Sequence, residues 1–325
     1  MANYLVTGAA GFIASKVCEQ LLMDGHQVLG IDNLNDSYDV QMKNWRLEQL
    51  KKQKDFTFLK LDIYDFKKLE DSISKCDHFD AIINLAARAG VRASVLNPWT
   101  YIDTNINGTL NLLEICQRYD IQKFILASTS SVYGADAPLP TTEEADSSHP
   151  LQSYAASKKG AEALCHSYHF LYGIDVTIFR YFTVYGPAGR PDMSMFRFTQ
   201  WINEKKPVKV FGTGEQTRGF TYVDDIARGT ILGLQKLGFE IINLGGHETI
   251  SINQMVTILE GMLNKKARIE KEPAHPADMM ANWADVSKAK ELLGWQPQID
   301  LKQGMQNLVD WYLAERTWTK NIHTL

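Results

Sequence analysis

The sequence predicts an α/β fold, in which a doubly wound parallel sheet is followed by a smaller mixed α/β lobe. Three observations support this prediction. Short apolar runs are hydrophobic on consecutive positions, the spacers between them are long enough for crossover helices, and this rhythm loosens after Tyr185. A chain of 325 residues is long enough for one large α/β unit or for two lobes.

Seven apolar runs are expected to form the strands of the sheet. Consecutive apolar positions suit a strand that is covered on both faces, as parallel strands usually are. The runs occupy residues 4–6, 28–31, 56–61, 81–85, 124–126 and 176–179, and a last run at 241–244 returns to the sheet. Turn signals at residues 186–187, 212–214 and 275–276 mark the second lobe.

The spacer between the second and third runs, residues 33–55, is expected to form an exposed amphipathic helix. Trp45, Leu47 and Leu50 supply its apolar positions. The basic residues between them, Lys43 and Arg46 included, are interpreted as a solvated face rather than as a binding patch.

The composition excludes several classes of protein. Thirty-four basic and thirty-eight acidic residues give a formal charge of -4, so no global positive field attracts nucleic acid or anionic lipid. The four cysteines form no CxxC pair, which argues against a zinc cage or a disulfide framework. The start of the chain does not resemble a signal peptide, and no apolar run approaches the roughly 18 residues of a membrane span. We expect a soluble, cytoplasmic protein with no nucleic-acid or membrane partner.

A glycine-rich turn follows the first apolar run directly. Gly8 and Gly11 permit a close backbone approach, and the helix that opens after them offers free N–H groups to a pyrophosphate. Asp32 ends the second run 21 residues after Gly11, where a carboxylate accepts hydrogen bonds from an adenosine ribose and repels a 2′-phosphate. This combination predicts a dinucleotide site that prefers NAD to NADP. Ala14 replaces the third glycine of the pattern, and we expect this substitution to be tolerated.

A second group of residues carries acid/base chemistry. Tyr154 and Lys158 are four residues apart and therefore share one face of a helix. Thr129 ends the fifth apolar run, and ligands of doubly wound sheets bind beyond the carboxyl ends of the strands. A phenol has an ordinary pKa of about 10, and a nearby cation stabilises its phenolate. The spacing therefore predicts an activated tyrosine next to the dinucleotide.

These segments together resemble the extended short-chain dehydrogenase/reductase family, and within it the nucleotide-sugar epimerases. The resemblance extends through most of the chain, and the order and spacing of its segments are more specific than any one of them. The segments are TGAAGFIAS (7–15), NLAARAGVRAS (84–94), ASTSSVYG (127–134), YAASK (154–158), RYFTVYGP (180–187) and GFTYVDD (219–225).

The resemblance implies a Rossmann-like, NAD-binding domain over residues 1–181 with a returning segment at about 222–247, and a UDP-sugar-binding domain over residues 182–325. Tyr154 is then the catalytic acid/base, Lys158 holds the nicotinamide ribose and lowers the pKa of the tyrosine, and Thr129 bridges Tyr154 to the sugar hydroxyl. The implied NAD contacts are these: Tyr154, Lys158, Gly8, Gly11, Phe12, Ile13, Asp32, Asn33, Asp62, Ile63, Leu85, Ala86, Ala87, Asn105, Ser128 and Tyr181.

The implied reaction is 4-epimerisation of a nucleotide sugar, in which a retained NAD oxidises C4 transiently and the 4-keto sugar is reduced on its other face. Related dehydratases carry an Asp-Glu pair where this chain has Ser130 and Ser131, so dehydration is disfavoured. Decarboxylases of UDP-glucuronate usually carry Glu at the position of Ser131, which weighs against that alternative. A non-catalytic NAD-sensing module, a different class of protein, would lose Tyr154 or Lys158.

Two further segments, residues 32–50 and 184–198, resemble the UDP-glucuronate 4-epimerases of this family. They imply UDP-glucuronate and UDP-galacturonate as the substrate pair, while a neutral UDP-hexose such as UDP-glucose stays open as an alternative. A guanidinium can hold a carboxylate through two parallel hydrogen bonds, and Arg190 is placed to do so. The implied UDP-sugar contacts are Arg92, Thr129, Ser130, Ser131, Thr183, Arg190, Arg218 and Asp278.

No metal site is expected. His166 and His169 have a spacing that could hold a metal ion, but no third ligand of matching spacing accompanies them. The family resemblance implies a homodimer formed through a four-helix contact.

Overall fold

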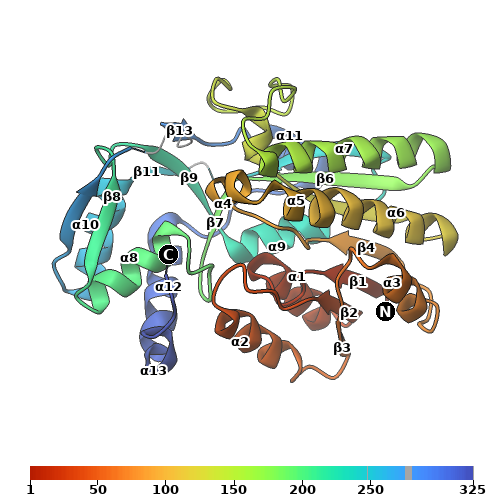
Figure 1. Ribbon diagram of the computed structural model, residues 1–325, viewed down its shortest axis with the longest axis horizontal. Helices are drawn as coiled ribbons and strands as arrows, with labels where there is room; N and C mark the ends of the chain where they lie inside the picture. The colour runs from red at the N-terminus through yellow and green to blue at the C-terminus, as the bar shows by residue number, and fades with distance from the viewer. Residues whose placement is uncertain (247, 275–279, 325) are drawn as a thin grey trace.

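A seven-stranded parallel sheet forms the larger lobe, in the order β10-β6-β5-β4-β1-β2-β3 (Figure 1). The computed structural model describes residues 1–246, 248–274 and 280–324. The strands of this sheet are β1 (Asn3–Thr7), β2 (Gln27–Asp32), β3 (Phe56–Lys60), β4 (Ala81–Asn84), β5 (Lys123–Thr129), β6 (Asp175–Tyr181) and β10 (Phe239–Leu244). Each expected apolar run overlaps one of these strands, which confirms the predicted fold class.

Helices cover both faces of the sheet, as consecutive apolar positions require. Leu5 and Val6 are neighbours on β1, are both fully buried, and belong to the cores on opposite faces. One face carries α1 (Phe12–Met23), α2 (Val40–Leu50), α9 (Val223–Leu232) and α11 (Ser287–Leu293). The other face carries α3 (Phe66–Ile73), α6 (Gly108–Arg118) and α7 (Ser153–Tyr172).

Short helices fill the connections around the carboxyl ends of β4 and β5. They are α4 (Val91–Leu96), α5 (Pro98–Tyr101), the π-helix η1 (Ile102–Asn107) and the 3₁₀-helix η2 (Ser130–Tyr133). The chain order reverses between β1 and β4, which is the switch point where such sheets open a crevice.

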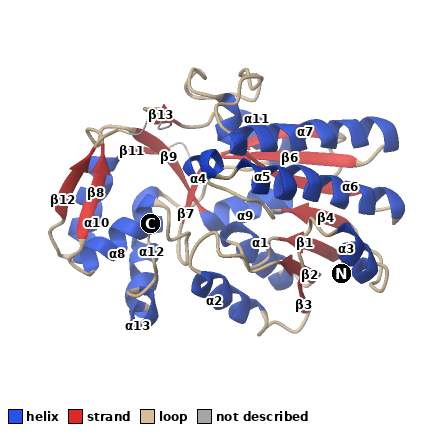
Figure 2. Cartoon of the chain, viewed as in Figure 1, coloured by secondary structure: helices blue, strands red, loops and turns tan. Residues whose placement is uncertain are grey.

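The smaller lobe mixes strands and helices around its own core (Figure 2). One sheet joins β11 to β9 to β13, with β7 also paired to β9, and a second sheet pairs β12 with β8. Its strands are β7 (Thr183–Tyr185), β8 (Pro207–Phe211), β9 (Thr217–Tyr222), β11 (Thr249–Ser251), β12 (Arg268–Glu272) and β13 (Ala281–Asn282). Its helices are α8 (Ser194–Asn203), α10 (Ile252–Leu263), α12 (Leu301–Ala314) and α13 (Arg316–Thr319).

One expectation about the spacer helix is wrong. Helix α2 forms where it was expected, and Asp39 caps it by accepting a hydrogen bond of 3.0 Å from the backbone N–H of Gln41. Lys43 and Arg46, however, are only 4% and 2% exposed and do not form a solvated face. Both lie on the side of α2 that packs against the rest of the protein. There they donate hydrogen bonds to backbone carbonyls and polar side chains.

Candidate active site

A cleft of about 600 Å³ opens where β1, β2, β3 and β4 end. Nine of the residues expected to bind NAD line it: Gly8, Gly11, Asp32, Asn33, Asp62, Ile63, Leu85, Ala86 and Ala87. These residues come from four separate βα connections, and the parallel sheet brings them to one edge. The cleft is therefore the candidate dinucleotide site.

The glycine turn is tight enough to explain both glycines. Gly8 has a φ of +72°, and a Cβ there would lie 2.9 Å from the Ala86 Cα. The Gly11 N–H donates to the Gly8 carbonyl at 2.7 Å, and a Cβ on Gly11 would lie 2.7 Å from that oxygen. Helix α1 begins directly afterwards without a side-chain cap, so its first N–H groups remain available to an anion.

Asp32 is held in a fixed position at the end of β2. It is 7% exposed, and its carboxylate accepts hydrogen bonds from the backbone N–H groups of Ala10 at 3.2 Å and Leu34 at 2.7 Å. Beside it, the Asn33 amide donates to Asp62 at 2.8 Å. Both carboxylates line the cleft, and that of Asp32 at the end of β2 is placed to accept hydrogen bonds from a ribose diol.

Tyr154 and Thr129 meet where the sheet and helix α7 converge. Tyr154 is half-buried beside the Thr129 hydroxyl, and its ring packs edge to face on Tyr101, with 6.1 Å between the ring centroids. Burial raises the pKa of Tyr154, while the neighbouring Thr129 hydroxyl and the positive charge of Arg190 act to lower it.

Lys158 is buried in the protein, and its ammonium has no hydrogen-bond partner among the described residues. The side chain is 2% exposed, and its Nζ makes no hydrogen bond to any residue that the structure describes. Burial lowers the pKa of Lys158 to about 8, although Cys165 and Glu162 act to raise it. A buried ammonium with three free donors fits a group that offers several hydroxyl oxygens, such as the ribose of a nicotinamide nucleotide.

Glu162 fastens the helix that carries Tyr154 and Lys158 to the sheet. Its carboxylate accepts hydrogen bonds from Ser128 at 2.6 Å and from Arg180 at 2.7 and 3.0 Å. Residues 154, 158 and 162 are spaced four apart, so one face of α7 carries all three. The buried ion pair therefore fixes the catalytic face of α7 against the ends of β5 and β6.

Three of the residues that were expected to bind the dinucleotide form side-chain hydrogen bonds with other residues of the chain. Asn105, fully buried, bonds both the backbone N–H and the carbonyl of Arg88 and donates to Ser157 at 2.9 Å. The Ser128 hydroxyl bonds Glu162, and the Tyr181 hydroxyl lies 2.7 Å from Thr230 on α9. None of the three lines the cleft. Ile13 likewise packs against the core, and Phe12 lines a neighbouring hollow.

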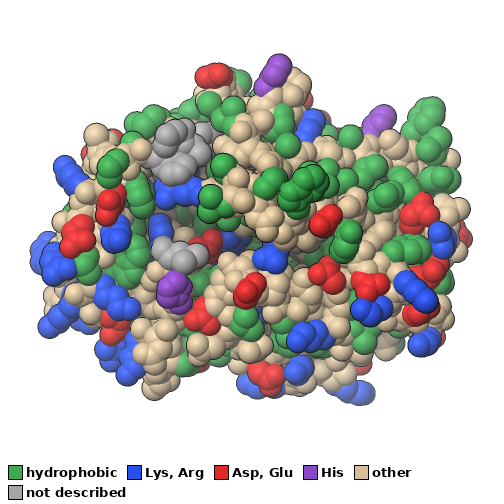
Figure 3. Space-filling model, in the orientation of Figure 1, with side chains coloured by type: hydrophobic (Ala, Val, Ile, Leu, Met, Phe, Trp, Pro, Cys, Tyr) green, Lys and Arg blue, Asp and Glu red, His purple; other side chains and the backbone are tan. Residues whose placement is uncertain are grey.

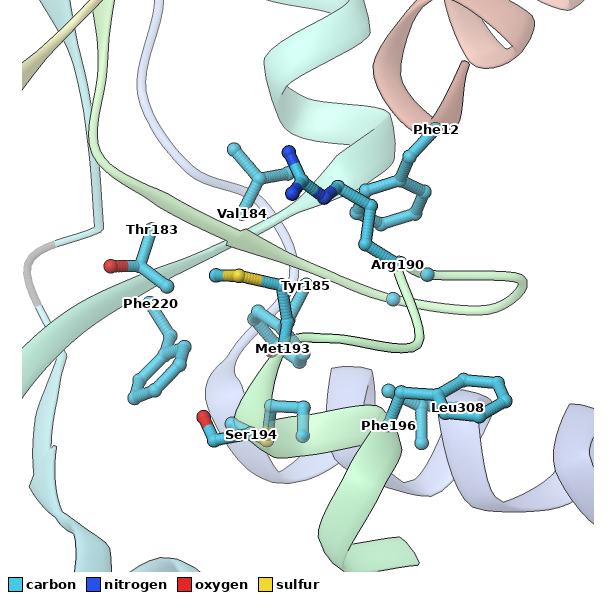
Figure 4. A pocket seen from close by; sticks show the side chains of 13 residues that line it. Phe12, Thr183, Val184, Tyr185, Arg190, Met193, Ser194, Phe196, Phe220 and Leu308 are labelled. Carbon is cyan, nitrogen blue, oxygen red and sulfur yellow. The ribbon is translucent and has the colours of Figure 1, made fainter. Parts of the chain in front are cut away.

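That hollow has a volume of about 270 Å³, and residues between 183 and 196 form most of its wall. Arg190 and Phe12 lie on one side of it, and Thr183 and Phe220 on the other (Figure 4). The Arg190 guanidinium forms a two-point pair with Asp192, at 3.0 and 2.6 Å. Arg190 also lines the dinucleotide cleft, so the two spaces meet at this residue. A ligand carboxylate would have to compete with Asp192 for Arg190.

The hydroxyls next to Tyr154 are organised by their neighbours. Thr129 donates to the Ser131 hydroxyl at 3.2 Å, and Asn282 on β13 donates to the Ser130 hydroxyl at 3.2 Å. Since the Ser130 oxygen accepts this bond, its own proton is free to point elsewhere. Sequence reasoning missed Asn282, because nothing near it in the chain marks it as a site residue.

The remaining residues expected to bind the substrate are Arg92, Arg218 and Asp278. Arg92 stacks on the Phe211 ring at 4.5 Å and so links α4 to the smaller lobe. Arg218 donates to the Thr217 carbonyl at 2.7 Å. Asp278 lies outside the described residues.

The cleft also contains residues that were not expected there. They are Asn35, Ser37, Tyr38, Lys43, Ala89 and Thr104. Lys43 donates to the Asn35 carbonyl at 2.8 Å, and burial lowers its pKa to about 8 despite the opposing effect of Asp32. A sequence signal for Lys43 existed. It is spaced four and seven residues from Leu47 and Leu50, which places it on the buried face of α2.

Neither a metal-binding cluster nor a membrane-spanning helix is found in the part of the chain that the structure describes. No group of three or more His, Cys, Asp or Glu side chains is arranged to hold a metal ion in that part of the chain. Among the helices described, none is long and apolar enough to span a membrane.

Comparisons with known proteins agree with this geometry. A UDP-glucuronate 4-epimerase of Thermodesulfobacterium geofontis is 56% identical over 312 residues, which is 96% of each chain. The structure of UDP-glucuronic acid 4-epimerase from Bacillus cereus, in complex with UDP-glucuronic acid and NAD, matches with a TM-score of 0.89 and 38% identity, over 96% of this chain and 99% of that one. A UDP-glucose 4-epimerase from Thermotoga maritima, solved with UDP-glucose, matches with a TM-score of 0.89 and 32% identity, over 97% and 99%.

The family model described as GDP-mannose 4,6 dehydratase matches residues 5–308. This match spans most of the chain, and the relatives above are similar over nearly their whole length. The chain therefore belongs to this family of extended short-chain dehydrogenases/reductases that act on nucleotide sugars.

Proposed function

We propose that this chain is an NAD-dependent UDP-glucuronate 4-epimerase, which interconverts UDP-glucuronate and UDP-galacturonate. The observation that carries the proposal is the surroundings of Tyr154. The Thr129 hydroxyl and the positive charge of Arg190 both act on this phenol, and Arg190 lines both the dinucleotide cleft and the second hollow. The relative that is 56% identical has the same activity.

The residues of the cleft and of helix α7 fit NAD. The tight turn at Gly8 and Gly11 leads into the uncapped N-terminus of α1, which suits a diphosphate, Asp32 suits the adenosine ribose, and the Nζ of Lys158 on α7 has unused donors. When bound, NAD supplies a reversible two-electron acceptor for the sugar C4. The related structure from Bacillus cereus contains NAD together with UDP-glucuronic acid.

The chain's own groups then divide the work. Tyr154 takes the proton of the C4 hydroxyl and returns it, and Thr129 holds the phenol in place. Lys158 anchors the ribose and brings a positive charge to the phenolate. The hydroxyls of Ser130, Ser131 and Thr183 donate to the sugar carboxylate, and Arg190 meets the same group once its pairing with Asp192 loosens.

Neutral donors suit this substrate for a further reason. The 4-keto form of UDP-glucuronate is a β-keto acid, which loses carbon dioxide when its carboxylate aligns with the carbonyl π system. Hydroxyl groups that hold the carboxylate out of that alignment protect the product. Ser130, oriented by Asn282, and Ser131, bonded by Thr129, supply such contacts without adding an acid that would promote elimination.

The test is to incubate the purified protein with UDP-glucuronate and with UDP-glucose separately, without added cofactor, and to separate the products by chromatography. We expect UDP-galacturonate from the first, and a higher kcat/KM for UDP-glucuronate than for UDP-glucose. A preference for UDP-glucose, a UDP-pentose as the main product, or stoichiometric release of NADH would each contradict the proposal.

We also propose which lobe binds which ligand, a homodimeric assembly and a cytoplasmic location. Residues 1–181, with 222–247, would hold NAD, and residues 182–325 would hold the UDP-sugar. A homodimer is supported by exposed apolar side chains on the face that carries α4, α5 and α7, where Figure 3 shows several hydrophobic areas. They are Val95 and Leu96 on α4, Trp99 on α5, and Phe170, Leu171 and Tyr172 at the C-terminal end of α7. All four cysteines are free thiols, which suits the reducing cytoplasm.

A further inference from the structure

Arg46 is a buried cation whose hydrogen-bond partners are all uncharged. Its guanidinium is 2% exposed, and no ion pair found among the described residues includes it. All five of its hydrogen bonds are donations to neutral oxygens. Burying a charge without a counter-ion is costly, so such a residue needs a compensating role.

The contacts of Arg46 join two functional loops. Nη1 donates to the carbonyl of Ala10 in the glycine turn at 3.1 Å and to the Tyr38 hydroxyl at 2.8 Å. Nε and Nη2 donate to the carbonyl of Ala188 at 2.9 and 2.7 Å, and Nη2 also reaches the carbonyl of Gly189 at 3.3 Å. One side chain thus connects the turn that faces the cofactor diphosphate to the loop of residues 186–193 that carries Arg190.

The loop at the other end of this contact is strained. Ala188 has a φ of +52°, in the left-handed region that residues other than glycine seldom adopt. Two donors from Arg46 hold its carbonyl, and the next two residues in the chain lead to the Arg190 guanidinium. The position of Arg190 therefore depends on a contact made by a residue of helix α2.

The position of the Arg46 guanidinium indicates which ligand group would balance its charge. The guanidinium lies 5.8 Å from the centre of the Phe12 ring, at the first residue of α1. That helix N-terminus is where a dinucleotide diphosphate is bound in folds of this kind. The two negative charges of the diphosphate would offset the buried cation without touching it.

We infer that Arg46 is a positioning residue that couples cofactor binding to the placement of the Arg190 loop. The inference rests on the proposed function, since the cofactor is taken to be NAD and the substrate UDP-glucuronate. The charge of Arg46 supports retention of the cofactor, and its forked geometry sets the affinity for the sugar. Lysine would preserve the charge and lose the fork.

The experiment compares Arg46→Met, Arg46→Lys and the control Lys51→Met, which removes an exposed cation at the end of the same helix. For Arg46→Met we expect roughly tenfold weaker NAD binding and a roughly tenfold higher KM for UDP-glucuronate, because several hydrogen bonds from a charged donor are lost. Arg46→Lys should restore NAD affinity to within about threefold and leave the KM raised. Hydrogen exchange of residues 186–193 should be faster in both variants than in the wild type.

A KM and an exchange rate of Arg46→Lys equal to those of Lys51→Met would overturn the inference, even if Arg46→Met does not yield folded protein. So would an Arg46→Met protein that loses only thermal stability. A wild-type protein that neither retains NAD nor converts UDP-glucuronate would instead overturn the proposed function, together with the coupling that depends on it.

Discussion

The dinucleotide cleft and the hollow beside Arg190 are built in different ways. The walls of the cleft are mainly the connections that follow β1, β2, β3 and β4, and each begins where a strand of the sheet ends. The hollow takes most of its wall from residues 183–196, with Phe12, Phe220 and Leu308 added from three distant parts of the chain. A site at strand ends inherits its geometry from the sheet, whereas a site made of loops depends on long-range contacts.

The two regions also treat charge differently. On helix α7 of the larger lobe, the Lys158 ammonium is buried with no hydrogen-bond partner among the described residues, and in the cleft Asp32 is held by backbone donors. In the hollow, the cation of Arg190 is already paired with Asp192. The larger lobe therefore offers unused donors to a ligand, whereas Arg190 would have to exchange an internal ion pair for one with the proposed substrate. This difference predicts that the protein retains NAD strongly. It also predicts that the sugar is selected mainly by hydrogen bonds from neutral hydroxyl side chains.

The largest effect should come from Tyr154, the proposed acid/base. Tyr154→Phe deletes the proton acceptor and little volume, so kcat should fall by about 10²- to 10⁴-fold. Retained NAD and the melting temperature should stay at wild-type values. The measurement is the initial rate of UDP-galacturonate formation together with the cofactor content. A rate near that of the wild type would remove Tyr154 from the mechanism.

The second prediction concerns the buried ammonium of Lys158 in the larger lobe. Burial lowers the pKa of Lys158 to about 8, below its ordinary value near 10.5 in the unfolded chain. The buried ammonium therefore destabilises the fold below about pH 8, and this penalty is relieved as the pH rises from about 8 to 10.5. Lys158→Met should stabilise the cofactor-stripped protein at pH 7 by about 1 to 3 kcal/mol while abolishing activity.

Urea unfolding at pH 7 and pH 10 measures this difference, with Lys51→Met as the control for losing an exposed lysine. The stabilisation should be smaller at pH 10 than at pH 7. If Lys158→Met is less stable than the wild type at pH 7, the cation is not an uncompensated charge and the contrast between the two regions is lost.

The third prediction concerns the sugar side alone. Ser130→Ala combined with Ser131→Ala should raise the KM for UDP-glucuronate by roughly tenfold, since two donors to a carboxylate are removed. The KM for UDP-glucose should change little. Chromatography of the products should reveal a UDP-pentose, released when the keto acid is no longer held. Equal effects on both sugars would show that these serines do not read the carboxylate.

The smallest effect is expected at the third position of the glycine pattern. Ala14 is 2% exposed, packs into the core and does not line the cleft. Ala14→Gly should cost roughly 0.5 to 1 kcal/mol of stability, because glycine lowers helix stability, and should leave NAD affinity unchanged. Urea unfolding and NAD titration measure the two quantities. Tighter NAD binding by the variant would mean that the methyl group restricts the cofactor.

Local features of the sequence were sufficient to predict the sheet and most of the cleft. Apolar runs, the glycine turn and Asp32 are each defined within a few residues, and parallel pairing then brings the strand ends together. Tyr154 and Lys158 are four residues apart, so the helix alone places them on one face. The burial of Lys43 and Arg46 was also readable from the same helical period, but lysine and arginine are usually solvated, and that preference led to the wrong interpretation.

Only the tertiary structure decided where the longer-range partners lie. Arg46 donates to Ala188, 142 residues away, and Asn282 donates to Ser130 across 152 residues. Ser128, expected at the cofactor, is bonded to Glu162 instead, and Asp192 occupies the fork of Arg190. The physical reason is that a hydrogen bond is satisfied by whichever donor or acceptor the folded chain brings within about 3 Å. Periodicity determines the face on which a side chain lies, and packing of distant segments determines what it meets there.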